Sequence, residues 1–420
     1  MTVLAEQIKN SKAPKGFWRS IMIFLAVLGP GIITANVDND AGGIATYSIA
    51  GAEFGYAFLW AVVPVVFALV VVQEMSARMG AITGKGLADL IRENYGAKIT
   101  FYAMLALMVT NLGNTMSEFS GVAASLEIFG VSKYISVPAA ALFVWFLVVK
   151  GTYKTVEKVF LVACVFYISY IVSGFMADPD WGMVGKEMIS PEFRFDAPWI
   201  YMLIGIIGTT IAPWQLFFMQ SSIVEKGIGV DQFRYSRWDA VVGCVMAGVV
   251  VFFIIVACAA TLHPAGIKIE TAADAALALE PLAGQYCSWL FAFGLFNASI
   301  FAATVLPLAV AYYICEGLGW EAGVNKTFKE APQFYVLFTA TILIGMGVVL
   351  IPGFPLFEMM VLSQVVNGVV LPAILVFMIL IINRKDIMGD YVNGRVWNAI
   401  SWFTVISTII LTFIMIFTFF

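Results

Sequence analysis

Two carboxylates stand close together inside an apolar stretch near the start of the chain. They are Asp38 and Asp40 in the octapeptide NVDNDAGG, residues 36–43, and the apolar run around them covers residues 21–50. If this run crosses a membrane, a charge there is costly, and such a carboxylate usually marks an ion or proton path. The alternative is that both residues only cap a helix end. We favour the ion path, and expect the glycine pair of the octapeptide to unwind the helix so that Asp40 faces the opening.

A second apolar run is interrupted in a similar way. Residues 205–222 read GIIGTTIAPWQLFFMQSS, with Pro213 in the middle. Proline lacks a backbone donor and disfavours helix at the preceding residue, Ala212. The carbonyl groups of Thr210, Ile211 and Ala212 would then lack helical partners and could point at a cation. A lone proline in a membrane helix is more often a simple kink, but two breaks at corresponding positions are a more specific signal.

A third stretch offers neutral oxygen ligands. In the segment SQVVNG, Gln364 and Asn367 are three residues apart and therefore share one face of a helix. Their amide oxygens could contribute to a cation site. Amides in membrane helices also join neighbouring helices by hydrogen bonds, and the sequence leaves both roles open.

The composition defines the elements that must position these residues. Hydrophobic residues make up 61% of the 420-residue chain, charged residues only 12%, and the mean hydropathy is +0.93. Such a chain is an integral membrane protein rather than a soluble one. A spanning helix needs about 20 apolar residues, and the sequence predicts eleven. They lie at about 21–50, 55–79, 100–126, 135–150, 156–177, 198–223, 238–262, 284–315, 333–352, 357–382 and 397–419.

The basic residues predict how these spans are oriented. With the N-terminus in the cytoplasm and the C-terminus outside, 19 of the 23 Lys and Arg residues lie on the inner side. We therefore expect a multi-pass protein of the cell (inner) membrane, in contact with the lipid bilayer. The two interrupted spans lie five spans apart, which predicts a five-plus-five inverted repeat within one domain, residues 1–420. The repeats would cover about 18–177 and 198–382, and the extra helix about 397–419.

Catalytic chemistry has little support in this sequence. The only histidine, His263, precedes a proline in a predicted outer loop, and the five cysteines show no metal-type spacing. No Ser/His/Asp, Cys/His or histidine-rich metal constellation can be assembled, so we expect a protein that is not an enzyme. We also expect no bound cofactor and no nucleic-acid partner, and assign no oligomeric state.

Four motifs resemble the Nramp family of divalent-metal transporters, the natural-resistance-associated macrophage proteins. They are GPGIITANVDNDAGGIATYSIAGAEFGY in span 1, SEFSG in span 3, APWQLFFMQSS in span 6 and SQVVNG in span 10. The resemblance covers spans 1 to 10 and implies a LeuT-like fold with broken helices 1 and 6. It also implies transport of divalent metal ions. The metal-binding Asp of the family's Asp-Pro-Gly-Asn motif corresponds to Asp40, and the rest of the motif to Ala41, Gly42 and Gly43.

Two departures from the family pattern concern the metal. Ala212 stands where typical members have a methionine, and Gly43 stands where the motif has its asparagine. A thioether selects softer transition metals, whereas oxygen ligands suit Mg²⁺, which keeps several of its waters. The larger and less coordinating site predicts an ion that arrives partly hydrated.

Other departures concern protons. Trp214 and Met219 replace the two span 6 histidines of typical members, and Thr115 replaces the Asp three residues before Glu118. Glu118 remains as a possible residual proton path. The loss of titratable groups predicts uncoupled transport, and the substitutions resemble those of the prokaryotic Nramp-related magnesium transporters.

The sequence therefore predicts a secondary transporter of Mg²⁺, and also of Mn²⁺, as transported substrates that move down their electrochemical gradient. The expected metal-site positions are Asp40, Gly43, Ile211, Ala212, Gln215 and Gln364. The expected pocket positions are Asp38, Thr210, Trp214 and Asn367.

Two alternatives belong to the same fold. One is a proton-coupled transition-metal (Mn²⁺/Fe²⁺) transporter of the Nramp type with relocated ligands. The other is a sodium-coupled amino-acid carrier, which Asp40 disfavours because it would repel the substrate's carboxylate.

Overall fold

The computed structural model describes residues 29–150 and 168–419, and every regular element in these ranges is a helix. Eight helical segments of these ranges are long and apolar enough to cross a membrane. They comprise α5 (Leu59–Thr83), α7 (Lys133–Lys150), α11 (Ala197–Thr210) with α12 (Pro213–Lys226), α13 (Phe233–Ala265), α16 (Cys287–Leu318), α17 (Pro332–Val349), α18 (Leu356–Ile382) and α20 (Arg395–Phe419). The predicted all-α membrane fold is confirmed.

The three remaining predicted spans also have helical counterparts. The first is formed by α3 (Pro30–Asn36), the 3₁₀ turn η1 (Val37–Asn39) and α4 (Ala41–Phe54), and its residues before 29 lie outside the described part. The third is α6 (Leu87–Glu127), in which Gly96 has a φ of 80° and separates a short initial segment from the span. The fifth is α9 (Ile168–Met176), and its expected beginning lies outside the described residues.

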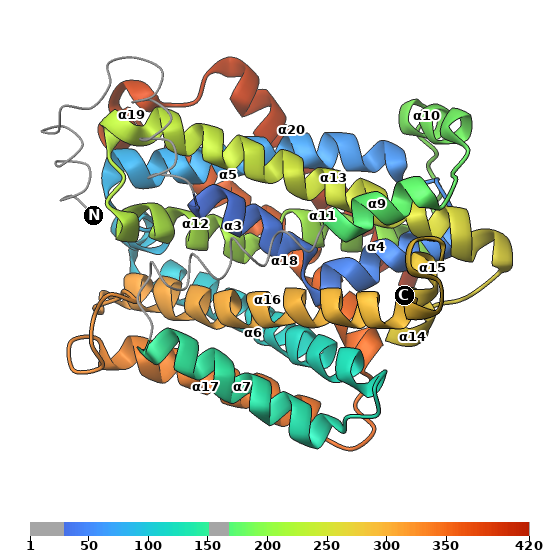
Figure 1. Ribbon diagram of the computed structural model, residues 1–420. Coiled ribbons are helices and arrows are strands. Elements are labelled where there is room, and N and C mark those ends of the chain that lie inside the picture. Colours follow the sequence, from blue (N-terminus) through green and yellow to red (C-terminus); the bar gives the residue numbers. More distant parts are fainter. Residues whose placement is uncertain (1–28, 151–167, 420) are drawn as a thin grey trace, which may run out of the picture.

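Short helices between the spans gather at the two ends of the molecule. At one end, which we call the outer end, Figure 1 shows α10 (Trp181–Ile189), α14 (Ala272–Ala276) and α15 (Glu280–Ala283). At the opposite, inner end lies α19 (Lys385–Met388). The 3₁₀ turns of these connections are η3 (Val230–Gln232), η4 (Leu277–Leu279), η5 (Gly284–Tyr286) and η6 (Gly389–Tyr391). This separation agrees with the alternation of spans predicted from the basic residues.

The expectation that His263 lies in a loop is wrong. Helix α13 continues through Pro264 and ends only at Gly266, whose φ of 65° places it in the left-handed region. His263 is therefore part of the helix, and its Nδ1 lies 2.9 Å from the carbonyl oxygen of Ala52. This contact ties the outer end of α13 to that of α4.

The interrupted helices occupy the centre of the molecule. The apolar window of α11 and α12 is completely buried, whereas those of α7, α17 and α20 are 33%, 39% and 22% buried. The latter three helices lie at the periphery, where their apolar side chains suit a lipid environment. Helix α18 approaches α11 closely, because a Cβ on Gly208 would lie 2.1 Å from the carbonyl oxygen of Gln364. Small residues permit such contacts between membrane helices.

Helix α3 is attached to α13 by a buried aspartate. The carboxylate of Asp239 accepts backbone hydrogen bonds from Gly29 (3.1 Å), Gly31 (2.7 Å) and Ile32 (3.4 Å) at the beginning of α3. A Cβ on Gly31 would lie only 2.4 Å from the backbone nitrogen of Ala240, so the two helices are in direct backbone contact. Asp239 therefore fixes the inner half of the first span.

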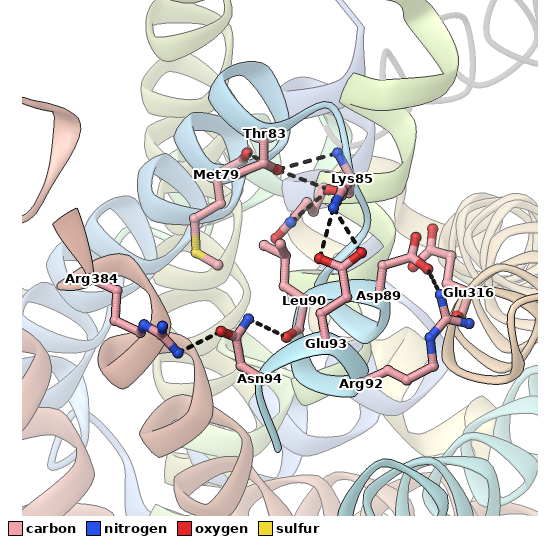
Figure 2. Close-up of polar contacts among 11 residues, drawn as sticks. Met79, Thr83, Lys85, Asp89, Leu90, Arg92, Glu93, Asn94, Glu316 and Arg384 are labelled. Carbon is pink, nitrogen blue, oxygen red and sulfur yellow. Dashed lines mark hydrogen bonds and ion pairs between the residues drawn. The ribbon is translucent and has the colours of Figure 1, made fainter. Parts of the chain in front are cut away.

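A network of charged residues connects helices at the inner end (Figure 2). Lys85 forms an ion pair with Glu93 (2.7 Å), and Arg92 forms one with Asp89 (3.0 Å). Arg92 also donates to the carbonyl oxygen of Glu316 at 2.8 Å, which joins α6 to the end of α16. These contacts fix the segment of α6 that precedes Gly96.

A second inner contact is a buried ion pair on α5. Arg78 and Glu74 are almost inaccessible and lie 3.1 Å apart. Arg78 further donates to Asn393 Oδ1 (2.5 Å) and to the carbonyl oxygen of Tyr391 (3.0 Å). The pair thereby holds the connection between α18 and α20 against α5.

Candidate metal site between two interrupted helices

The first interruption lies at residues 37–40, immediately before the glycine pair. Asp40 is the N-cap of α4, with an extended backbone (φ −70°, ψ −175°), and its carboxylate accepts the N–H of Gly43 at 2.6 Å. Gly42 and Gly43 are already helical, so the expectation that they unwind the chain is wrong. The cap is the physical reason, because it satisfies a free donor and lets the helix start directly after Asp40.

The two glycines instead allow neighbouring segments to pack closely against the first turn of α4. A Cβ on Gly43 would lie 2.3 Å from the carbonyl oxygen of Asp38, and a Cβ on Gly42 would lie 1.9 Å from Nε2 of Gln364. Neither position accepts a side chain without movement of its neighbour. Gly43 thus contributes its N–H to Asp40, and Gln364 reaches the first turn of α4 because Gly42 leaves room for it.

The second interruption lies where the sequence places it. Helix α11 ends at Thr210. Ile211 (φ −125°, ψ 73°) leaves the helical region, Ala212 (φ −77°, ψ 138°) is extended, and Pro213 begins α12. The carbonyl oxygen of Ala212 accepts the N–H of Gln215 at 3.2 Å. In the described chain the carbonyl groups of Thr210 and Ile211 accept no backbone hydrogen bond. The predicted break and two of its three free carbonyls are therefore present.

Asp40 is paired with Glu118 from α6. Glu118 Oε2 accepts the N–H of Ala41 at 3.2 Å, and the two carboxyl groups are in hydrogen-bonding contact. Both side chains are buried, and Oε1 of Glu118 has no partner in the described residues. Two carboxylates in contact repel each other unless a cation or a proton lies between them. This pair is the strongest candidate for a cation ligand set.

Asp38 belongs to a separate set of contacts. Its side chain accepts a hydrogen bond from Gln215 at the start of α12, and Gln215 Oε1 accepts one from Gln73 of α5 at 2.7 Å. The carbonyl oxygen of Asp38 accepts the hydroxyl of Thr209 at 3.4 Å. Near this point Thr210 shares a hydrogen bond of 2.8 Å with Tyr47 of α4. The two interruptions are thus directly connected.

The amides of α18 combine both roles that the sequence leaves open. Asn367 exchanges hydrogen bonds of 3.0 and 3.1 Å with Asn114 of α6, which joins the two helices. Asn367 also donates to Gln364 Oε1 at 2.9 Å. Gln364 lies against the first turn of α4, whereas Asn367 lies one turn away within the amide network. Gln364 is therefore the nearer of the two to Asp40, with its amide nitrogen beside Gly42 and its amide oxygen bonded to Asn367.

Trp214 and Met219, two non-titrating residues of the second interrupted span, differ in their surroundings. Trp214 is buried in the apolar core with Phe218, their ring centroids 6.3 Å apart. Met219 packs in a small cluster at the inner side, and its sulfur accepts the hydroxyl of Thr34 at 3.8 Å. Neither side chain can carry protons, and the chain's single histidine, His263, lies at the outer end of α13.

The donor set around the interruptions consists of oxygen atoms. The described part of the chain holds no group of three or more His, Cys, Asp or Glu side chains placed to bind a metal ion. A site here would use one or two carboxylates with carbonyl, amide and water oxygens. That composition fits Mg²⁺, which is held by few carboxylates and keeps several waters.

A cavity of about 860 Å³ lies at the outer end of the molecule, on the outer side of the two interruptions. Its walls come from the connection at residues 269–271 and from α4, α11 and α18, the helices whose deeper residues form the candidate site. Three of its lining residues, which we call the cavity glutamates, are acidic: Glu53, Glu270 and Glu358. Negative charge in a cleft raises the local concentration of cations.

Sequence reasoning missed several polar residues of this region. They are Tyr47, Gln73, Asn111, Asn114, Thr209 and Asp239. Each stands inside an apolar run, which is the signal that could have found them, since polar groups in membrane helices usually face protein.

The helices and the two interruptions define an all-helical membrane protein with a LeuT-like fold. A family model described as natural resistance-associated macrophage protein-like matches residues 31–418. The chain therefore belongs to the Nramp family of transporters, as its motifs predict.

Solved structures of a manganese transporter from Eremococcus coleocola share the fold. One is a complex with an aromatic bis-isothiourea substituted compound and another is a mutant of that transporter. In both comparisons the identity is 20% and the TM-score 0.80. The match covers 97% of this chain and 89% of the other.

Proposed function

We propose that this protein carries Mg²⁺ across the cell membrane down the electrochemical gradient and without coupled protons. It also carries Mn²⁺, which its site does not strongly distinguish from Mg²⁺. The observation that carries the proposal is the all-oxygen donor set at the two interruptions. Asp40 and Glu118 supply the charge, and the carbonyl groups of Thr210 and Ile211 supply neutral oxygen. Gln364 could add its amide oxygen, which accepts from Asn367 in this structure. The transported ion is the substrate, and no bound cofactor is part of the proposal.

The absence of a sulfur ligand at the break supports Mg²⁺ over softer metals. Ala212 is buried directly beside the break, where a methionine would offer a thioether. Carboxylate, amide and carbonyl oxygens are hard ligands, and they bind Mg²⁺ and Mn²⁺ without favouring iron or cadmium. A partly hydrated ion needs fewer protein ligands, which agrees with the small number of carboxylates here.

The surroundings of Asp40 support transport without protons. Trp214 and Met219 cannot titrate, and the carboxyl groups near Asp40 in the described residues are those of Glu118 and Asp38. An inside-negative potential favours entry of a divalent cation by about 4.6 kcal/mol per 100 mV, twice the value for one charge. This driving force is sufficient for uptake without a proton gradient.

The proposed route begins in the outer cavity and ends in the cytoplasm. It requires the orientation predicted from the basic residues, with the N-terminus inside and the C-terminus outside the cell. The interrupted helices would belong to two inverted repeats, about 18–177 and 198–382, which enclose the site between them.

Transport by purified protein in liposomes tests the proposal. With a potassium-diffusion potential, negative inside, we expect Mg²⁺ influx without acidification of the lumen. Replacing Asp40 with Asn should reduce the influx at least tenfold, while the exposed control Asp390→Asn should leave it unchanged. Proton entry that scales with Mg²⁺ entry, or full activity of Asp40→Asn, would contradict the proposal.

The alternative is a proton-coupled transition-metal transporter. The contact between Asp40 and Glu118 favours it, because two carboxyl groups can share a proton, and the similar solved structures are manganese transporters. In that case micromolar Fe²⁺ or Cd²⁺ would outcompete millimolar Mg²⁺, and a pH gradient alone would accelerate uptake. We expect neither effect.

A further inference from the structure

We propose that Asp38, Gln73 and Gln215 form a second cation position, the inner position, which receives the ion after it leaves Asp40. The inference rests on the proposed function, because it concerns the route of a transported cation. Asp38 lies in the 3₁₀ turn η1, Gln73 in α5 and Gln215 in the first turn of α12.

The hydrogen bonds of this group leave two oxygen atoms open. Gln73 donates to Gln215, and Gln215 donates to one oxygen of Asp38, so the donors form a chain that ends on the carboxylate. The other carboxylate oxygen, Oδ2 of Asp38, has no partner, and neither has Oε1 of Gln73. Both residues are at most 2% exposed. A carboxylate oxygen and an amide oxygen are the ligands that a hard cation prefers.

The charge of Asp38 also has no counterpart. The ion pairs of the described chain do not include Asp38, and a single amide donor does not neutralise a buried carboxylate. An unpaired carboxylate in a membrane interior is costly and is retained mainly where an ion passes. A cation bound at this point would remove the imbalance.

The inner position is separate from the Asp40 pair. Asp40 contacts Gly43 and Glu118, whereas the side chain of Asp38 accepts its hydrogen bond from Gln215. Glu118 lies nine residues from the outer end of α6, whereas Gln73 lies ten residues from the inner end of α5 and fourteen from its outer end. The inner position is therefore closer to the cytoplasmic side than the Asp40 pair.

Two successive positions suit a transporter better than a single strong one. The carboxylates of Asp38 and Asp40 are close enough to repel each other. A divalent cation at Asp40 reduces this repulsion. When the cation moves toward Asp38 it exchanges one carboxylate ligand for another, so it is not left without a charged ligand on the way. Transport requires binding that is favourable enough for entry and weak enough for release, and several sites in sequence provide both.

Binding of Mn²⁺ to the purified full-length protein in detergent, followed by electron paramagnetic resonance, tests the inference. We expect Asp40→Asn to retain one weakly bound Mn²⁺, with the dissociation constant raised about tenfold or more. The double variant Asp40→Asn/Asp38→Asn should bind none. Gln73→Leu in the Asp40→Asn background should weaken the residual binding by several-fold. Equal binding by Asp40→Asn and the double variant would overturn the inner position.

A flux measurement separates this inference from a purely structural role of Asp38. Asparagine has the shape of a protonated aspartate, so it preserves the fold if Asp38 only forms hydrogen bonds. We expect Asp38→Asn to keep Mn²⁺ binding at Asp40 and to lose Mg²⁺ influx at least tenfold. Normal influx in Asp38→Asn would overturn the inference and leave the proposed function intact. Absence of Mg²⁺ influx in the unmodified protein would instead overturn the proposed function.

Discussion

Adding one methyl group at Gly43 should stop transport while leaving the protein folded. The Cβ of Gly43→Ala would lie 2.3 Å from the carbonyl oxygen of Asp38 and 3.0 Å from the hydroxyl of Thr209. An ordinary contact with the carbonyl oxygen begins at 3.4 Å. The backbone of η1 must therefore move by about 1 Å relative to α4, and Asp38 and Asp40 flank the moving segment.

The expected magnitude follows from these distances. Inserting a methyl group into a packed site costs about 1–3 kcal/mol. Alanine recovers up to about 1 kcal/mol, because it favours the helix over glycine. Global stability should thus change little. A displacement of about 1 Å at a reacting or binding group lowers activity about 100-fold, so we expect Mg²⁺ influx of Gly43→Ala to fall to the order of 1%.

The assay is Mg²⁺ influx into liposomes, read with an enclosed fluorescent indicator. Gly347→Ala is the matched control, because a Cβ at this position in α17 meets no atom within 4 Å. We also expect Gly43→Asn, which restores the residue of the family motif, to be at least as impaired as Gly43→Ala, because its side chain is larger. Full activity of Gly43→Ala, or an equal loss in Gly347→Ala, would refute the close approach as the cause.

Three further predictions concern the ends of the molecule. Asp239→Ala removes the carboxylate that accepts the backbone N–H groups of Gly29 and Gly31 at the start of α3. It should lower the unfolding free energy by about 2–4 kcal/mol, seen as an earlier thermal melt than that of Asp239→Asn. Replacing all three cavity glutamates with glutamine should raise the Mg²⁺ concentration for half-maximal influx several-fold at low salt and have little effect at high salt; an unchanged value at low salt would exclude steering. Arg78→Met should destabilise by about 3–5 kcal/mol because it leaves Glu74 buried and without its partner on α5, whereas the double replacement Arg78→Met/Glu74→Met should recover most of that loss. Equal melting temperatures of the single and double variants would contradict this explanation.

The sequence predicts the spans well, because long apolar runs need no tertiary information. The break at Ile211–Ala212 is also predictable, since Pro213 removes a donor within the helix whatever surrounds it. The first break is harder. Its position depends on the Asp40 side chain capping α4, and sequence alone does not show whether an aspartate or the following glycines end the helical hydrogen bonds.

The partners of the site residues are less predictable than the residues themselves. Asp40 and Glu118 are recognisable as carboxylates in apolar runs, but their contact requires α4 and α6 to be packed in a specific register. Asp239 and Gly31 are 208 residues apart, and nothing in either segment indicates the other. Gln73 stands beside Glu74 in an apolar run and was detectable as a polar residue, whereas its link through Gln215 to Asp38 depends on the fold.

The polarity of the two interruptions explains how one site can attract a cation and still release it. Helix α4 begins at the site, and its free N–H groups are used by the carboxylates of Asp40 and Glu118, which moderates their negative charge. Helix α11 ends there, so the carbonyl groups of Thr210 and Ile211 add partial negative charge without a full ionic bond. Carboxylates whose charge is partly offset by helix donors bind a divalent cation less tightly than free ones. Removing one of the backbone N–H donors of α4, rather than a carboxylate, should therefore slow release of the cation from the site more than its entry.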